Sequence, residues 1–187
     1  MARKLMRAAF LILLGIAVIY ASAPTLGKLV GIKIPDPMAT FAERGVSEGA
    51  CADDGVTLVI DFGTKTKRSP KVYCATHYGD VSTDNGWNIF VAAHRKVQGT
   101  ANYPTGFVCR IDGFPSVRTE NCRDTPSASA GHWSYFKATG AAGWAYSHVG
   151  AAQDSVTCGN WIGWRFVNAD ESMYAQPRIP AVPFVCR

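Results

Sequence analysis

Six cysteines constrain this chain of 187 residues more than any other feature. All of them lie beyond position 50: Cys51, Cys74, Cys109, Cys122, Cys158 and Cys186. In an oxidising compartment, an even number of cysteines is typical of a disulfide framework. We expect sequence neighbours to pair, Cys51 with Cys74, Cys109 with Cys122 and Cys158 with Cys186, although other pairings are possible on paper. No C-x-x-C or H-x-x-x-H spacing occurs, so we expect no metal site.

The N-terminal segment, residues 1–26, predicts the compartment. Arg3, Lys4 and Arg7 are followed by an apolar run without charge over residues 8–26, which is the order of a signal peptide. Cleavage after Ala21 is one interpretation. An uncleaved signal anchor, a hydrophobic helix that would hold the chain in the membrane, is the other. Either way we expect an extracytoplasmic protein, secreted or anchored at the outer face of the cell membrane.

The remaining chain divides into three parts by composition. Residues 27–50 have little periodicity and are interpreted as a linker, with one short helical turn near residues 38–44. Residues 51–167 are expected to form the folded domain. Residues 168–187 are rich in proline, and we expect this extension to wrap the surface and to be fastened by Cys186.

The formal net charge of +5 does not indicate a nucleic-acid partner. Three of these charges belong to Arg3, Lys4 and Arg7, so the rest of the chain is nearly neutral. It contains no basic stripe and no recognition motif, and we therefore expect no nucleic acid.

Alternating and β-branched runs predict six strands. They cover residues 55–62, 70–75, 107–111, 132–136, 143–148 and 161–167. A polar turn at residues 63–69 would join the first two runs in a hairpin, and Asp112-Gly113 would end the third in a tight turn. Gly163 suggests a bulge in the last strand, which we expect to close the sheet.

A single helix is predicted between the second and third of these strands. Asp84 or Asn85 can cap it, and Gly99 would end it. Its apolar face follows the helical period: Trp87, Phe90, Val91 and His94. The resulting fold class is α+β, a mostly antiparallel β-sheet with one packed helix, preceded by the N-terminal hydrophobic helix. This order is commonest in β-grasp-like folds.

Three motifs resemble a known family. They are Ile111-Asp112-Gly113, Trp133-Ser134-Tyr135 and the closing run over residues 159–166, GNWIGWRF. Their order over about residues 51–167 is similar to a small exported bacterial domain related to the C-terminal domain of transcobalamin and intrinsic factor. The resemblance implies a β-grasp-like, non-catalytic binding or accessory module. It also implies a possible cobalamin-like ligand, and a membrane uptake system as the protein partner.

Aromatic residues on two predicted strands are the candidate ligand-binding residues: Trp133, Tyr135, Trp144, Tyr146 and His148. One interpretation is a platform on which a flat small molecule, such as a corrinoid or a carbohydrate, would stack. The other is that these rings fill the core between sheet and helix, which is the commoner place for buried aromatic side chains. A single histidine can also ligate cobalt or haem iron, and His77 and His148 are the candidates for that role.

No catalytic constellation is found, so we expect that the protein is not an enzyme. Neither G-x-S-x-G nor H-E-x-x-H occurs, and an even cysteine count leaves no free thiol for a Cys/His hydrolase. Asp61, Asp112 and Asp124 lie at turns and strand ends, where aspartate commonly stabilises the turn. The alternative to a binding module is a structural accessory subunit, anchored by its N-terminal helix in a larger membrane protein complex.

The cysteine pattern can be checked by counting thiols in the denatured protein. We expect no reactive thiol before reduction and six after it, because all six cysteines are paired. A reactive thiol in the unreduced chain would revive the hydrolase hypothesis.

Overall fold

The computed structural model describes residues 44–126 and 129–186. The predicted signal segment, most of the predicted linker and nearly all of the predicted helical turn at 38–44 therefore lie outside the described residues. Within the described part of the chain, no helix is long and apolar enough to cross a membrane. Residues 44–126 and 129–186 are mostly β, with a mixed six-stranded sheet, one very short helix and three disulfides.

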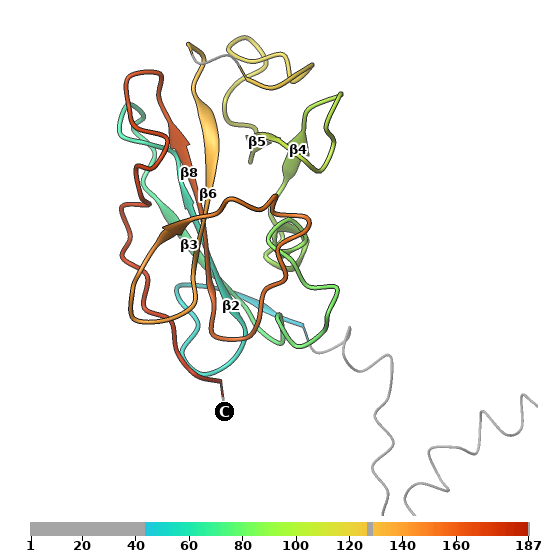
Figure 1. Cartoon of the computed structure of the whole chain (residues 1–187), viewed down its shortest axis with the longest axis vertical. Helices are drawn as coiled ribbons and strands as arrows, with labels where there is room; N and C mark the ends of the chain where they lie inside the picture. Colours follow the sequence, from blue (N-terminus) through green and yellow to red (C-terminus); the bar gives the residue numbers. More distant parts are fainter. Residues whose placement is uncertain (1–43, 127–128, 187) are drawn as a thin grey trace, which may run out of the picture. The chain divides into compact units, whose positions relative to one another are not determined.

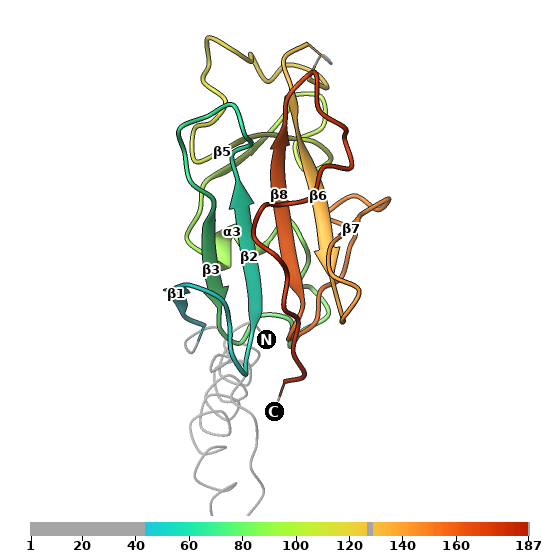
Figure 2. The same cartoon turned by 90° about the vertical axis from the view of Figure 1, so that its left-hand side faces the viewer.

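The six-stranded sheet has the order β1-β3-β2-β8-β6-β7 (Figure 2). Its strands are β1 (Val46–Glu48), β2 (Val56–Asp61), β3 (Lys71–Ala75), β6 (His132–Ala138), β7 (Ala145–Tyr146) and β8 (Trp161–Val167). Adjacent strands are antiparallel except that β2 runs parallel to β8. A second sheet pairs β4 (Val97–Gly99) with β5 (Val108–Ile111). The antiparallel pairing of β2 with β3 confirms the hairpin predicted from residues 55–62 and 70–75.

The last strand, β8, does not close the sheet as expected but lies between β2 and β6. All seven of its residues are buried. A strand that is buried on both faces reads as a continuous apolar run, and such strands belong in the middle of a sheet. The run Trp161–Val167 carried this signal, but the parallel partner β2 lies about a hundred residues earlier and no local pattern indicates it.

Part of the predicted linker forms the edge strand β1. Val46, Ser47 and Glu48 pair with Ala75, Cys74 and Tyr73 of β3. The disulfide between Cys51 and Cys74 lies directly after this pairing. The sheet therefore includes residues that precede the first cysteine.

The predicted helix is reduced to α3 (Ile89–Ala92). Asn85 does not cap this helix: its Oδ1 accepts hydrogen bonds from the backbone N–H groups of Trp87 and Asn88 in the turn before it, and the N-cap residue is Asn88, whose side chain makes no cap hydrogen bond. The helix ends early because His94 adopts a φ of 52° and the following residues pair in β4. Val91, expected on the buried face, is 72% exposed. Pairing with β5 has therefore replaced the last turns of the helix.

The two faces of the sheet are covered by different segments (Figure 1). On one face, α3 and the β4–β5 sheet cover a core that includes Leu58, Ile60, Phe90 and Trp164. On the other face, the C-terminal extension covers a smaller core of Val59, Phe136, Ala138, Trp144 and Trp161. Residues alternate between the two cores along β2 and β8, as the pleat requires.

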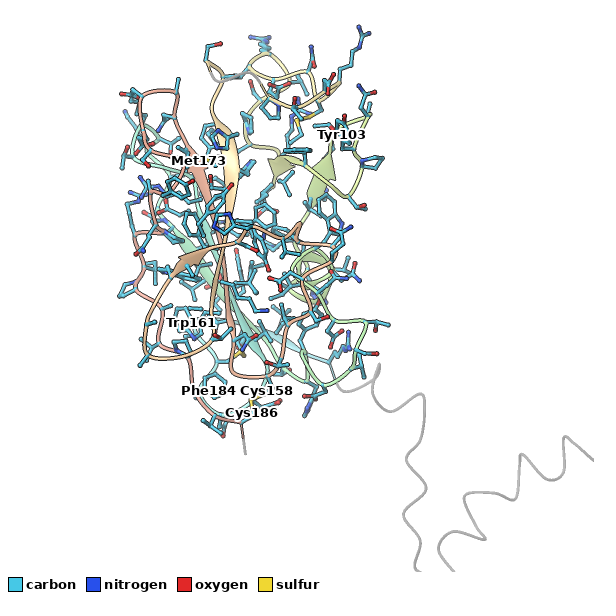
Figure 3. The ribbon with its side chains drawn as sticks, viewed as in Figure 1. Tyr103, Cys158, Trp161, Met173, Phe184 and Cys186 are labelled. Atoms are coloured by element: carbon cyan, nitrogen blue, oxygen red, sulfur yellow. A yellow bond between two sulfur atoms is a disulfide. The ribbon has the colours of Figure 1, made fainter. Side chains whose placement is uncertain are left out.

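All three disulfides pair as the sequence predicts. They are Cys51–Cys74, Cys109–Cys122 and Cys158–Cys186, with Cα–Cα distances of 4.8, 5.5 and 6.0 Å. The third joins the C-terminal extension to the loop before β8, close to Trp161 (Figure 3). The Asp112-Gly113 turn is also confirmed, with φ values of 48° and 74° and two backbone hydrogen bonds between Ile111 and Phe114. This is the two-residue hairpin turn that such a dipeptide favours.

Gly163 does not form a bulge, because its pairing with Val59 and Phe136 continues without a shift in register. The reason for a glycine here is space. A Cβ atom at this position would lie 2.8 Å from Cγ of Pro177 and 2.8 Å from Cζ3 of Trp144. The missing side chain thus lets Trp144 and the extension lie directly on β8.

Replacing Gly163 by alanine tests this packing. We expect Gly163→Ala to lower the free energy of unfolding by about 1–3 kcal/mol, because a methyl group would overpack the contact with Trp144. Urea unfolding followed by tryptophan fluorescence measures the change. The matched control is Gly140→Ala, since a Cβ at Gly140 meets no atom within 4 Å. Equal effects of the two substitutions would contradict the packing argument.

Candidate functional site

The structure divides the five predicted ligand-binding residues between the two faces of the sheet. Trp133 and Tyr135 lie in the core under α3, and each is 7% exposed. The Trp133 ring packs edge-on against Phe62 and Phe166, with centroids 5.8 and 5.5 Å apart. The five residues therefore form no single platform, and these two occupy the core position that the sequence analysis considered as the alternative.

The Tyr135 hydroxyl belongs to a partly buried polar cluster. It donates to Asp154 Oδ2 at 2.8 Å, and the Lys137 ammonium donates to Oδ1 of the same carboxylate at 2.9 Å. Burial and the Asp154 charge both raise the pKa of Tyr135, so its hydroxyl stays protonated. Such a hydroxyl acts here as a structural hydrogen-bond donor.

Trp144 lies in the second core and helps to fasten the C-terminal extension. It is 7% exposed, and its ring packs against Trp161 with centroids 6.2 Å apart. Its indole N–H donates to the backbone oxygen of Ile179 at 2.7 Å. Its backbone oxygen accepts from the Gln176 side chain at 3.0 Å. Trp144 thus holds the segment that covers it.

Tyr146 and His148 remain near the surface, where a third ring joins them. The Tyr146 centroid is 5.4 Å from His148 and 5.0 Å from Tyr174, both in edge-to-face contact. Tyr174 is 56% exposed, and His148 is exposed as well. We call Tyr146, His148 and Tyr174 the β7 aromatic cluster. Sequence reasoning missed Tyr174, because it lies in an aperiodic extension.

The sheet positions one half of the β7 aromatic cluster. Tyr146 pairs with Phe136 of β6, and their rings are also in edge-to-face contact at 5.7 Å. The next residue, Ser147, donates its backbone N–H to the backbone carbonyl oxygen of Tyr135 at 3.0 Å. Burial and the neighbouring Tyr174 raise the pKa of the Tyr146 hydroxyl, so it is neutral in ordinary solution.

Two ion pairs position the other half by holding the extension on both sides of Tyr174. On one side, Glu171 accepts from the Arg165 guanidinium at 2.7 Å and from the Asn168 backbone N–H at 3.0 Å. On the other, Arg178 donates to both oxygens of Asp61, whose side chain is completely buried, with one contact at 2.6 Å. Tyr174 is thereby held between two fixed points.

The same hydrogen bonds set the ionisation of both carboxylates. Burial alone would raise the pKa of Asp61, but hydrogen bonds from Arg178 and from backbone N–H groups outweigh this effect and hold the pKa below its usual value. Burial likewise opposes ionisation of Glu171, yet hydrogen bonds from Asn168, Thr64 and Arg165 lower its pKa to about 2. Both groups are therefore charged at neutral pH.

The two candidate ligating histidines lie in separate places. His148 belongs to the β7 aromatic cluster, whereas His77 Nδ1 lies 3.1 Å from Asp54 Oδ2 in the loop after β3. Nearby, Asp54, Asp80 and Cys158 each place one potential ligand atom within 4.8 Å of the others. Cys158 is in a disulfide, so its sulfur is not the thiolate that binds metals.

The fold and this surface define a disulfide-stabilised, mostly β domain with an aromatic cluster at one edge of its sheet. Comparison with protein-family models, with curated proteins and with solved structures finds no match. The resemblance to the transcobalamin-related domain therefore stays a prediction.

We expect the stability contributed by the anchoring of the extension to depend on pH. Because the folded pKa of Glu171 is about 2 and its ordinary value 4.5, the stability that it contributes is present above pH 4.5. That stability is lost as the pH falls toward 2. We expect Glu171→Gln to lower the free energy of unfolding by about 1–3 kcal/mol at pH 7 and to weaken the acid dependence in this window.

Urea unfolding at a series of pH values measures this effect. Asp53→Asn is the control, since Asp53 is an exposed carboxylate outside the extension. An unchanged acid dependence in Glu171→Gln would show that Glu171 does not anchor the extension.

Proposed function

We propose that this chain is an extracytoplasmic, non-catalytic binding module that holds a planar, largely apolar small molecule on the β7 aromatic cluster. The observation that carries the proposal is the exposure of two neighbouring rings: Tyr174, on an extension anchored to Arg165 and Asp61, and His148, in the loop after β7. Three disulfides suggest an oxidising environment outside the cytoplasm. A rigid surface of this kind binds without first being ordered, which lowers the free-energy cost of binding.

The chemistry of the β7 aromatic cluster suits a flat ring system. The Tyr146 and Tyr174 rings meet at an interplanar angle of 78°, so an incoming ring can stack on one while it contacts the edge of the other. The His148 imidazole beside them can donate or accept a hydrogen bond, or ligate a metal at the centre of the ring system. A cobalamin-like corrinoid has both features, a planar ring and a central cobalt.

The topology supports a β-grasp-like fold for this module. In the order β3-β2-β8-β6, two antiparallel pairs are joined by the parallel pairing of β2 with β8. The second strand of the domain, β2, and the last, β8, thus lie side by side at the centre of the sheet. This central parallel pairing favours the hypothesis of a β-grasp-like fold.

The N-terminal sequence favours a second candidate, an accessory subunit anchored in a larger membrane protein complex. Residues 8–26 carry no charge and follow three cations. Mass spectrometry of the chain purified from its native membrane distinguishes the two candidates. An intact N-terminus with companion membrane proteins would favour the accessory subunit, and a processed chain without companions would favour the binding module.

Aquacobinamide, a corrinoid whose axial water ligand an imidazole can replace, is the probe for the binding site. We expect the full chain to bind it, and Tyr174→Ala to weaken binding by at least about tenfold, because a stacked ring is lost. His148→Ala should remove the visible spectral change that imidazole coordination causes. Isothermal titration and absorption spectroscopy measure both effects.

The matched control for this experiment is Tyr103→Ala. Tyr103 is 48% exposed, similar to Tyr174, but it lies on the β4–β5 loop. Absence of binding, or equal affinities for the unchanged chain and Tyr174→Ala, would rule out the β7 aromatic cluster as a corrinoid site.

A further inference from the structure

We propose that a second surface, formed by the β4–β5 loop and the excursion after β5, binds an uncharged carbohydrate. We call this region, residues 97–126, the β4–β5 lobe. The site would combine two exposed aromatic rings on the loop with a polar groove on the excursion. It is independent of the β7 aromatic cluster: Tyr103 in the β4–β5 lobe and Met173 next to Tyr174 lie at opposite sides of the molecule in Figure 3.

The β4–β5 lobe is held rigidly although most of it lies outside regular structure. The disulfide between Cys109 and Cys122 fastens the excursion to β5. Arg110, which is 6% exposed, donates from Nε to the Pro115 oxygen at 2.9 Å and from Nη1 to Gln98 Oε1 at 3.0 Å. It also donates from Nη2 to the backbone oxygen of Glu120. One buried guanidinium therefore joins β4, β5 and the excursion.

Two aromatic rings stand exposed on the loop between β4 and β5. Tyr103 and Phe107 are 48% and 46% exposed, and they meet edge to face with centroids 5.5 Å apart. Two hydrogen bonds fix the loop. The Tyr103 backbone N–H donates to Thr100 Oγ1 at 3.1 Å, and the Phe107 backbone N–H donates to the backbone carbonyl oxygen of Tyr103 at 3.3 Å. These two adjoining rings offer an apolar contact surface on a loop held by hydrogen bonds.

A polar groove of about 370 Å³ lies on the neighbouring excursion. Its polar lining residues are Thr119, Glu120, Asn121, Arg123, Asp124 and Thr125. Backbone hydrogen bonds from Ala101 to Cys122 at 2.8 Å and from Asn102 to Arg123 at 3.1 Å place the groove beside the loop that carries Tyr103. The volume is within the range of small-ligand sites.

This combination of groups fits a sugar better than other ligands. A pyranose ring offers an apolar C–H face, which stacks on aromatic rings, and hydroxyl groups that both donate and accept hydrogen bonds. The groove offers donors on Arg123 and Asn121 and acceptors on Glu120 and Asp124. Because cationic and anionic side chains occur together, the groove does not select a strongly charged polymer. An uncharged saccharide uses all of these groups.

The experiment titrates the full chain with neutral linear oligosaccharides: cellohexaose, chitohexaose, maltohexaose and laminarihexaose. Isothermal titration gives the affinities, and saturation-transfer NMR identifies the sugar protons that contact the protein. We expect saturable binding of at least one of these probes, little changed by salt because charge pairing contributes little. In the NMR experiment, we expect the strongest saturation transfer at the ring C–H protons of the sugar.

The variants locate the site. Tyr103→Ala and Phe107→Ala should each weaken saccharide binding by at least about fivefold, since each removes one stacking ring. Arg123→Gln should weaken it to a similar or smaller extent while leaving the fold intact, because the Arg123 side chain lines the open groove. Tyr174→Ala, the matched exposed tyrosine on the other surface, should leave saccharide binding unchanged.

Failure of this proposal can be told apart from failure of the corrinoid site. Tyr103→Ala tests saccharide binding and is the control for corrinoid binding, whereas Tyr174→Ala tests corrinoid binding and is the control for saccharide binding. Binding of none of the saccharides would overturn the proposal. So would equal affinities for the unchanged chain, Tyr103→Ala and Phe107→Ala, or binding that disappears at high salt.

Discussion

A buried carboxylate at the end of β2 determines how the second face of the sheet is covered. Asp61 has no exposed surface, and an unpaired charge in that position would cost several kcal/mol. Its partner is Arg178, which lies 117 positions later and donates both side-chain and backbone hydrogen bonds to it. This pair brings the C-terminal extension across the sheet, where Ile179 and Ala181 pack on the second core. The proline-rich extension is therefore part of the folded domain.

The central strands β2 and β8 are buried on both faces, so the sheet needs a cover on each side. Neither cover is a large regular element. One is α3 with the β4–β5 sheet, and the other is the extension. The disulfides fasten these covers: Cys109–Cys122 holds the β4–β5 lobe and Cys158–Cys186 holds the end of the extension. The β4–β5 lobe belongs to the first cover, and the extension contributes Tyr174 to the β7 aromatic cluster, so each proposed binding surface includes loop residues of a cover.

Sequence reasoning succeeded where the signal was local and failed where a distant segment decided the outcome. Asn85 accepts hydrogen bonds in the turn before α3, but the helix ends at Ala92 because His94 adopts a positive φ and the next residues pair with β5. Gly163 was interpreted as a bulge, whereas it makes room for Trp144, a contact between segments about twenty residues apart. Among the candidate site residues, Trp133 and Tyr135 went into the core, and only Tyr146 and His148 stayed near the surface. Burial depends on what covers a residue, and periodicity does not report that.

The sequence by itself determined the β2–β3 hairpin, the Asp112-Gly113 turn and the positions of most strands. Each of these follows from residue types within a short stretch of chain, through backbone preferences and the alternation of side chains. Only the tertiary structure decided that β8 lies parallel to β2, that the extension covers the second face, and that Tyr174 joins Tyr146 and His148. These outcomes depend on contacts between residues far apart in the chain, and the free energy of such contacts has no local pattern.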